Sequence, residues 1–374
     1  MIIGIPKEIK PQETRMALTP KWVEKLTMQG HIVLVEKDLG INANASNEEY
    51  IDAGARLVES VTELYEACEF IVKVKDFTDE EIKILPFHEG QIIMTFLHLG
   101  ENDPHPLVVN KLIEKKVKAI GLELMQNDEG IREVIKPMSQ IAGNLAVVVA
   151  AHYSQFHNGG RGVSLIPLKD GKKAKILVLG GGNSGSAAIE TALNIGCEVV
   201  VIQKEGKTFN RLKKEFPQLN IKLWSEDVCT EELKKADVVI NAIYPVVGMK
   251  LPLITREMLK EMKPKSVLID LAGCGIVETW RFTSIDDPIF WEENVLHYGV
   301  DNMPALVPET SCEALSNSIF KYVEAIANKG FEQACKENNT LRRGVCFYNG
   351  KIVNEDVAYT HKMSFSEFLG VENE

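Results

Sequence analysis

Several chemical features are scarce in this 374-residue chain, and each absence excludes a class of protein. The seven cysteines are scattered without a CxxC pair, which argues against a zinc site and against a disulfide framework. No apolar run reaches the roughly 20 residues of a membrane helix, and the N-terminus has no signal-peptide core. Positive charge is in deficit, because 42 Lys and Arg face 53 Asp and Glu, a net charge of −11. We therefore expect a cytoplasmic protein with reduced thiols, no metal, no membrane contact and no nucleic-acid partner.

The length and the spacing of apolar segments predict an α/β protein with two Rossmann-like domains, each built on a parallel sheet. A single core usually stops growing at roughly 250–300 residues, so this chain is long enough for two. Short apolar runs alternate with helical stretches from the start, which is typical of parallel sheets. The predicted strands are 2–5, 31–36, 70–74, 92–95, 117–122, 176–179, 198–203, 221–224, 238–242, 267–270 and 296–300. The predicted helices are 20–29, 50–55, 61–67, 106–115, 140–156, 186–195, 310–327 and 330–337. The last helices are expected to return to the first domain, which gives domains of 1–135 with 310–374, and of 136–309.

A glycine-rich turn between a strand and a helix predicts a dinucleotide site in the second domain. The strand residues 176–179 lead directly into Gly180-x-Gly182-x-x-Gly185. Gly180 is expected to make the tight turn, Gly182 to let the backbone approach a pyrophosphate, and Gly185 to let helix and strand pack closely. Free N–H groups and the helix dipole would then face the phosphates, whereas the alternative is a glycine-rich turn without a ligand. The loop residues assigned to the cofactor are Gly180, Gly182, Asn183, Ser184 and Gly185.

The end of the second Rossmann strand bears on the choice of nucleotide. An acidic residue there usually accepts the ribose hydroxyls of NAD, but this chain has Gln203 followed by Lys204. Without a carboxylate, a 2′-phosphate is no longer repelled, and Lys204, Lys207 or Arg211 could attract one. In the alternative interpretation Gln203 hydrogen-bonds the ribose of NAD and the lysines are solvated. We expect NAD as the cofactor, with NADP as the alternative, and assign Gln203 and Lys204 to its binding.

A set of short motifs is spread along nearly the whole chain. They are 4–20 (Gly-Ile-Pro-Lys-Glu-Ile-Lys-Pro-Gln-Glu-Thr-Arg-Met-Ala-Leu-Thr-Pro), 72–75 (Val-Lys-Val-Lys), 95–99 (Thr-Phe-Leu-His-Leu), 137–143 (Pro-Met-Ser-Gln-Ile-Ala-Gly), 159–162 (Gly-Gly-Arg-Gly) and 302–304 (Asn-Met-Pro). In content and order they resemble the alanine dehydrogenase and transhydrogenase alpha-subunit family. The resemblance implies that the first domain and the C-terminal helices bind substrate and that the middle segment binds NAD(P). It also implies that the reaction takes place in a cleft between the two domains. We also expect a homo-oligomer.

The chemistry of such a reaction draws attention to three side chains. A dehydrogenase of amino or oxo acids needs cations for the carboxylate and an acid/base group at the reacting carbon. Arg15 suits the carboxylate as a bidentate fork and Lys75 as a point charge, and the resemblance implies these roles. His98 follows an apolar strand, and an imidazole titrates near neutral pH, so His98 is the expected proton donor and acceptor, with Lys75 as a second catalytic residue. In the alternative interpretation Arg15 forms a surface salt bridge, Lys75 ends an edge strand and His98 is structural.

The resemblance also extends the site and shows where this chain differs. It implies that Asn302 contacts substrate and that Ser139 and Met303 contact the cofactor. Alanine dehydrogenases typically carry a second aspartate four residues after the position of Asp270, and this chain has Cys274 there. Because an unperturbed thiol is protonated near pH 7, it cannot replace a carboxylate. Another acid such as Asp301 occupying that space is the alternative, and Asp270 itself matches a structural aspartate. A further difference is Gln140, where family members often have Glu.

Together these observations predict an NAD(P)-dependent dehydrogenase acting on CH–NH₂ or CH–NH groups, similar to alanine dehydrogenase, with a small amino or oxo acid as substrate. L-Alanine with pyruvate and ammonia is the leading substrate pair. One alternative is an imine-reducing saccharopine-type or opine-type dehydrogenase that joins an oxo acid and a diamine amino acid, because residues 282–289 resemble a segment of carboxyethylornithine synthase. The other is a non-catalytic nucleotide-binding homologue, for which Cys274 is the argument. A membrane-spanning transhydrogenase is disfavoured because the chain has no membrane region, whereas this argument does not apply to a separate soluble transhydrogenase subunit.

Overall fold

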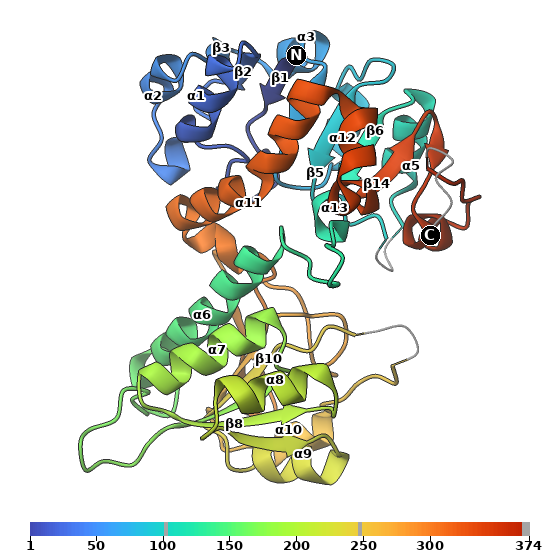
Figure 1. Ribbon diagram of the computed structural model, residues 1–374. Helices are drawn as coiled ribbons and strands as arrows, with labels where there is room; N and C mark the ends of the chain where they lie inside the picture. Colours follow the sequence, from blue (N-terminus) through green and yellow to red (C-terminus); the bar gives the residue numbers. More distant parts are fainter. Residues whose placement is uncertain (101–103, 246–248, 369–374) are drawn as a thin grey trace. The chain divides into compact units, whose positions relative to one another are not determined.

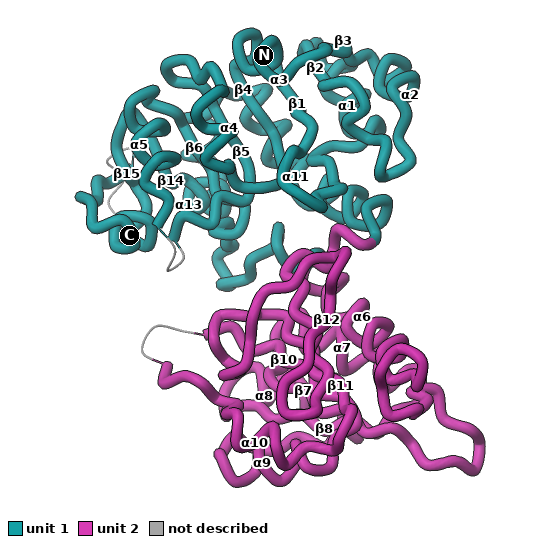
Figure 2. Tube along the Cα trace, turned by 180° about the vertical axis from the view of Figure 1, so that it is seen from behind, with its two compact units in different colours: residues 1–138, 307–374 teal, residues 139–306 magenta. Residues whose placement is uncertain are grey.

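The protein divides into two compact units, each with its own sheet (Figures 1 and 2). The computed structural model describes residues 1–100, 104–245 and 249–368. Unit 1 consists of Met1–Met138 and Val307–Glu374, and unit 2 of Ser139–Leu306. The boundaries expected from the sequence lie a few residues away from these breaks. Figure 2 shows that the C-terminal segment belongs to the same unit as the N-terminal one.

The sheet of unit 1 is parallel through most of its width and antiparallel at one edge. β14 runs antiparallel to both β6 and β15, and the turn between β14 and β15 places Asn349 and Gly350 at φ 50° and 74°. Left-handed residues at both positions are typical of a two-residue hairpin. This edge was not expected from the sequence. In order across the sheet, the strands are β15 (Lys351–Ile352), β14 (Val345–Tyr348), β6 (Lys118–Gly121), β5 (Ile92–Thr95), β4 (Phe70–Val72), β1 (Ile2–Ile5), β2 (Ile32–Glu36) and β3 (Arg56–Val58).

Some helices of unit 1 begin at capping boxes, and the helices of this unit come from both ends of the chain. Thr78 forms a capping box with Glu81 at the start of α4, and Ser46 does so with Glu49 at α2. The long helix α11 returns to unit 1, where the Met16 N–H lies 3.1 Å from Cys312 Sγ. The helices are α1 (Pro20–Met28), α2 (Asn47–Asp52), α3 (Val61–Ala67), α4 (Asp79–Ile84), α5 (Pro106–Glu114), α11 (Pro308–Lys329), α12 (Phe331–Glu337), α13 (Asn339–Arg343) and α14 (Glu355–His361), with 3₁₀ turns η1 (Ile41–Ala43) and η2 (Leu122–Leu124).

The sheet of unit 2 has the strand order of a Rossmann unit. β12 pairs antiparallel with β13 at one edge, and the other strands are parallel. Together with unit 1 this confirms the α/β class with two mostly parallel sheets. In order across the sheet, the strands are β12 (Ile289–Glu292), β13 (Val295–Tyr298), β11 (Val267–Asp270), β10 (Val238–Asn241), β7 (Lys175–Leu179), β8 (Glu198–Gln203) and β9 (Asn220–Leu223).

Both faces of this sheet are buried, which explains why its strands read as continuous apolar runs. Ile176 and Val178 of β7 face a core with α6, α7 and α8, whereas Leu177 and Leu179 face a second core with α9 and α10. A Cβ on Gly143 would lie 2.1 Å from the Ser184 carbonyl oxygen, so α6 and α7 are in close contact. The helices are α6 (Lys136–Tyr153), α7 (Asn183–Asn194), α8 (Lys207–Glu215), α9 (Glu226–Leu233) and α10 (Arg256–Lys260), with 3₁₀ turns η3 (Phe156–Asn158) and η4 (Met303–Leu306). Among the described residues, no helix has the length and apolar character needed to cross a membrane.

An ion cluster is buried just beyond the carboxyl end of β4. Lys73 is 1% exposed, and its Nζ lies 3.1 Å from Glu81 Oε1 and 3.5 Å from Glu8 Oε2. Burial lowers the pKa of Lys73, but Glu8 and Glu81 outweigh burial and raise it above its ordinary value. The two carboxylates therefore keep the buried ammonium group of Lys73 charged.

Replacing Lys73 by Ala should destabilise the protein strongly. The change leaves two buried carboxylates without their cation, and breaking a buried pair in this way typically costs about 3–5 kcal/mol. The matched control is Lys37→Ala, which removes an exposed pair with Glu59, and such exposed pairs are worth about 1 kcal/mol or less. Urea unfolding of both variants measures the difference. Equal losses in the free energy of unfolding for Lys73→Ala and Lys37→Ala would contradict the idea that the fold depends on the buried cluster.

Candidate functional site

Lys75 and His98 follow the ends of neighbouring parallel strands of unit 1. β4 pairs with β5, and beyond the strands the Phe96 N–H donates to the Val74 carbonyl at 3.0 Å. The Thr95 hydroxyl donates to the Lys75 carbonyl at 2.8 Å, which ties the two segments together. Because the carboxyl ends of parallel strands carry functional groups in α/β proteins, this edge is a suitable place for a substrate site. The structure thus brings two of the predicted residues to one edge.

Asp76 links Lys75 and His98 electrostatically. Burial raises the pKa of Asp76, but the charges of Lys75 and Lys10 outweigh burial, so its pKa lies below the ordinary value. His98 lowers the pKa of Asp76 further, and Lys10 Nζ lies 2.9 Å from Asp76 Oδ1. Lys10, Lys75 and His98 therefore all lower the pKa of one carboxylate. Sequence reasoning assigned no role to Asp76, although it directly follows Lys75 in the chain.

Arg15 forms a salt bridge in the interior of unit 1. Its Nε lies 2.7 Å from Glu13 Oε1 and its Nη2 lies 2.6 Å from Glu13 Oε2, and both side chains are buried. Its Nη1 contacts Met138 Sδ at 3.4 Å. The alternative interpretation placed a salt bridge of Arg15 on the surface, whereas the ion pair that Arg15 forms with Glu13 is buried. Glu13 therefore balances the charge of Arg15 within the fold, and the bidentate geometry fixes the orientation of the guanidinium.

The glycine loop of unit 2 contains the tight turn expected at Gly180 and the close packing expected at Gly185. Gly180 has φ 83°, a left-handed value that suits a tight turn. A Cβ on Gly185 would lie 2.0 Å from the Gly180 carbonyl oxygen, so close packing requires glycine there. A Cβ on Gly182 would have no described atom within 4 Å, and this residue and Asn183 are exposed at the start of α7. The loop therefore leaves an open backbone at a helix N-terminus, which fits a pyrophosphate.

Two side chains brace the glycine loop from the neighbouring strand and helix. The Gly181 N–H donates to Gln203 Oε1 at 2.8 Å, and Arg211 Nη2 donates to the Gly181 carbonyl at 2.6 Å. Arg211 also pairs with Glu215 at 2.7 Å and contacts Ser186 Oγ at 2.9 Å. Lys204 and Lys207 are exposed. Gln203 thus takes part in shaping the loop, a role that sequence reasoning did not assign to it.

The loop that carries Cys274 is shaped by Asp270. Asp270 Oδ1 accepts hydrogen bonds from the Ala272 and Gly273 N–H groups at 3.1 and 2.9 Å, and from Asn241 Nδ2 at 2.8 Å. Burial raises the pKa of Asp270 to about 6. Residues 273–275 have φ 61°, 58° and 75°, and the Cys274 side chain is exposed. These contacts agree with the interpretation of Asp270 as a structural aspartate.

The remaining predicted residues lie apart from the glycine turn in sequence but belong to unit 2. Met303 is 1% exposed and its side chain is part of the core against the β7 face, so a contact with a nucleotide would have to come from its backbone. Asn302 and Ser139 are half-buried, the first beside η4 and the second on α6. Gln140 and Asp301 are exposed. The roles predicted for these residues stay predictions.

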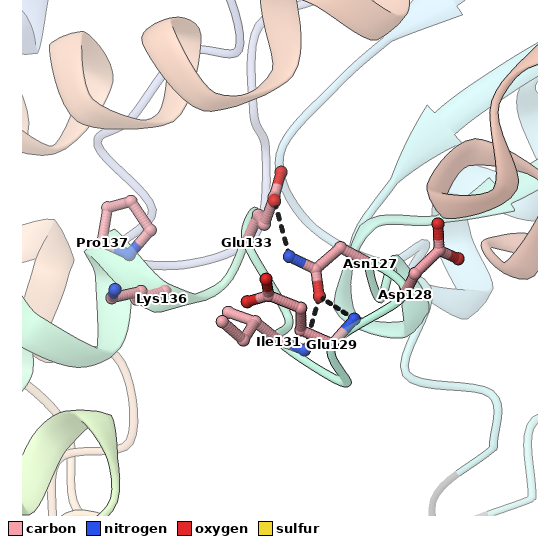
Figure 3. Close-up of a pocket in the computed structure, with 7 residues that line it drawn as sticks. All are labelled: Asn127, Asp128, Glu129, Ile131, Glu133, Lys136 and Pro137. Atoms are coloured by element: carbon pink, nitrogen blue, oxygen red, sulfur yellow. Dashed lines mark hydrogen bonds between the residues drawn. The ribbon is translucent and has the colours of Figure 1, made fainter. Parts of the chain in front are cut away.

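A hollow of about 580 Å³ lies on unit 1 before α6, and Figure 3 shows its lining. Asn127 closes this turn on itself: its Oδ1 accepts from the Glu129 and Ile131 N–H groups, and its Nδ2 donates to Glu133 at 2.8 Å. None of the lining residues is a predicted site residue. Within the described part of the chain, no group of His, Cys, Asp and Glu is arranged to hold a metal ion. The lining residues are Asn127, Asp128, Glu129, Ile131, Glu133, Lys136 and Pro137.

Comparisons with known proteins cover both units. The family model for the alanine dehydrogenase/PNT N-terminal domain matches residues 4–142, and that for the C-terminal domain matches 146–355. An alanine dehydrogenase of Methanococcus maripaludis is 35% identical over 98% of both chains. Alanine dehydrogenase 1 of Staphylococcus aureus is 37% identical over 99% of this chain and 100% of its own. A solved L-alanine dehydrogenase superposes with a TM-score of 0.89 at 32% identity, covering 97% of this chain and 99% of its own.

Substituting Ala for Gly185 should destabilise unit 2, whereas the same change at Gly182 should not. The added methyl at Gly185 overlaps the Gly180 carbonyl, while at Gly182 it meets open space. We therefore expect a lower melting temperature for Gly185→Ala only, since overpacking typically costs about 1–3 kcal/mol. Gly182→Ala should keep the wild-type melting temperature but bind NADH more weakly, measured by nucleotide fluorescence. If folded Gly182→Ala binds NADH with wild-type affinity, the assignment of the pyrophosphate to this loop is contradicted.

Proposed function

We propose that this chain, which belongs to the alanine dehydrogenase/PNT family, oxidises L-alanine to pyruvate and ammonia and catalyses the reverse reaction. The family makes it an NAD(P)-dependent oxidoreductase of amino acids. The observation that carries the choice of substrate is the full-length similarity to alanine dehydrogenases at 35% and 37% identity. The site supports it, because Arg15, Lys75 and His98 all lie in one unit and the glycine loop in the other.

The proposed roles follow from the chemistry of each side chain. Arg15, held rigidly by Glu13, and Lys75 bind the substrate carboxylate, since fixed cations retain their strength in a water-poor site. His98 moves a proton at the substrate nitrogen or oxygen. When bound, the nicotinamide nucleotide supplies the hydride acceptor. In unit 2, the exposed N–H groups at the start of α7 bind the pyrophosphate, and Gln203 keeps the loop in shape.

Cys274 gives the second candidate function, an imine-reducing dehydrogenase that joins an oxo acid to a diamine amino acid. The residue replaces a carboxylate that alanine dehydrogenases typically carry, and its side chain is exposed on the loop after β11. Among the family's reactions, alanine turnover forms a free ammonium product, which an anionic side chain stabilises and a neutral thiol does not. The hypothesis of a non-catalytic homologue is also based on Cys274, and it predicts nucleotide binding without turnover.

The native enzyme should oxidise alanine slowly, and Cys274→Asp should raise its rate. Restoring an anion strengthens the interaction with cationic intermediates, and Asp tolerates the left-handed conformation of this position. The control is Cys274→Ala, which removes the thiol without adding charge and should leave the rate unchanged. Nicotinamide absorbance measures turnover with alanine, and then the reverse reaction with pyruvate plus ammonia, lysine or ornithine. Rapid native turnover of alanine that Cys274→Asp fails to increase would contradict the role assigned to residue 274.

NAD is the proposed cofactor, with NADP as the alternative. Arg211 is the cation best placed to attract a 2′-phosphate, but its guanidinium is engaged with Glu215, Gly181 and Ser186. Gln203 Oε1 already accepts one N–H, and an amide oxygen has a second lone pair for a ribose hydroxyl. These contacts favour a nucleotide that brings hydroxyl groups over one that brings a phosphate.

The wild-type protein should bind NADH more tightly than NADPH, and Gln203→Asp should widen the difference by repelling the 2′-phosphate. The control is Gln218→Asp, the same change of charge at an exposed position of unit 2 beyond α8. Dissociation constants for both nucleotides, measured by fluorescence, give the ratio. We expect about a tenfold change, equivalent to roughly 1.4 kcal/mol, for Gln203→Asp alone. Tighter binding of NADPH by the wild type would overturn the choice of NAD.

The homo-oligomer and the cytoplasmic location are also proposals. Ile166, Leu168 and Phe156 of unit 2 expose large apolar side chains, which a second copy of the chain would cover. The cysteines are free thiols, six of them buried, which suits a reducing compartment.

A further inference from the structure

Two buried carboxylates accept backbone N–H groups at the two candidate catalytic residues of unit 1. Glu8 accepts the N–H groups of Val74 and Lys75 at 2.6 and 3.2 Å. Glu123 accepts those of Leu97 and His98 at 3.1 and 2.8 Å. In each case the carboxylate accepts the N–H of the site residue and that of the residue before it. The two carboxylates reach these positions from different parts of the chain, Glu8 after β1 and Glu123 within η2.

The contacts around Lys75 fix its peptide from both sides. Glu8 accepts its N–H, and the Thr95 hydroxyl donates to its carbonyl at 2.8 Å. Glu8 is held in turn by Lys73, which lies 3.5 Å away and whose own second partner is Glu81. Lys75 lies beyond the last residue of β4, where the sheet ladder no longer sets the backbone. Side-chain contacts therefore replace the ladder at this residue.

The contacts around His98 hold a conformation that this residue rarely adopts. His98 has φ 52°, in the left-handed region that costs L-residues roughly 1–2 kcal/mol. The two oxygens of Glu123 each accept one N–H, so the carboxylate fixes the peptide on either side of Leu97. Gly121 leaves the space for this carboxylate, because a Cβ there would lie 3.0 Å from Glu123 Oε1. At His98 the backbone is no longer extended, and the orientation of the imidazole depends on this backbone conformation.

We propose that Glu8 and Glu123 are positioning residues, which aim Lys75 at the substrate carboxylate and His98 at the reacting carbon by clamping their backbones. The inference rests on the proposed function for the roles of Lys75 and His98, but the clamps themselves can be measured without turnover. Burying a carboxylate is costly unless it is hydrogen-bonded or paired, and the N–H donors that offset this cost belong to the backbone at Lys75 and His98. Neither residue needs to touch the substrate.

Kinetics separate this role from a general loss of stability. Glu123→Ala should lower kcat for alanine by about 10²-fold with little change in KM, because a displacement of about 1 Å in a catalytic group has that effect. Glu8→Ala should mainly raise KM for alanine, since Lys75 binds the carboxylate, by about tenfold, or roughly 1.4 kcal/mol. The NADH dissociation constant should stay at the wild-type value in both variants.

Glu81→Ala is the matched control. Glu81 is buried and shares Lys73 with Glu8, but its carboxylate contacts Lys73 Nζ and accepts the N–H of Thr78 at the start of α4. Glu81→Ala should lose stability without a selective change in kcat or KM.

Two milder variants cover the case in which an alanine variant does not fold. Thr95→Val removes the hydroxyl that holds the Lys75 carbonyl, and Gly121→Ala crowds the Glu123 carboxylate while keeping its charge. Thr95→Val should raise KM, as Glu8→Ala does, and Gly121→Ala should lower kcat, as Glu123→Ala does.

Amide hydrogen exchange, followed by mass spectrometry on peptides covering 73–76 and 96–99, reads the clamps directly. The wild type should exchange slowly in both peptides, Glu8→Ala or Thr95→Val should accelerate the first, and Glu123→Ala or Gly121→Ala the second. Failure of the wild type to turn over any amino acid would overturn the proposed function, while the exchange pattern would still decide whether the clamps exist. Unchanged exchange in the clamp variants, or kinetics matching those of Glu81→Ala, would overturn the positioning role.

Discussion

Buried carboxylates that accept backbone N–H groups are the interaction that holds the chain beyond the strand ends in both units. Parallel strands deliver side chains to one edge of a sheet, but their hydrogen-bond ladder ends there. Beyond the ladder, unit 1 holds the chain with Glu8 and Glu123, and unit 2 holds it with Asp270. Each carboxylate replaces water and ladder partners with fixed acceptors. The cost of burying them is offset by N–H donors and, for Glu8, by Lys73.

Much of the fold could be predicted because local patterns determine it. Apolar runs bounded by turns located the parallel strands, and the spacing of three glycines predicted a tight turn and a close helix contact that the structure contains at Gly180 and Gly185. Two hairpin edges were missed although their signals were present. Asn349-Gly350 is a strong hairpin turn, and Glu293 and Asn294 occupy the left-handed region between β12 and β13. The Thr78 and Glu81 capping box likewise marks α4.

The candidate site was less predictable, since its organisation depends on contacts distant in sequence. Nothing local indicates that Glu8 binds the backbone of Lys75, or that Glu123 binds that of His98. Gln203 illustrates the same limit, because sequence reasoning considered it only as a ligand for ribose, whereas its amide also accepts the Gly181 N–H. Residue types at strand ends indicated where chemistry could occur. They did not indicate which neighbouring groups would fix the geometry.

The identity of residue 274 is a question of chemistry more than of folding. The loop around it takes its shape from Asp270, which binds two loop N–H groups, and from left-handed glycines on either side. Cys274 itself has φ 58°, a conformation that Asn and Asp adopt more readily than other side chains. The backbone therefore gives no reason to have cysteine there in place of aspartate. Since the loop also leaves this side chain exposed beyond β11, the effect proposed for Cys274 is one of charge and not of packing.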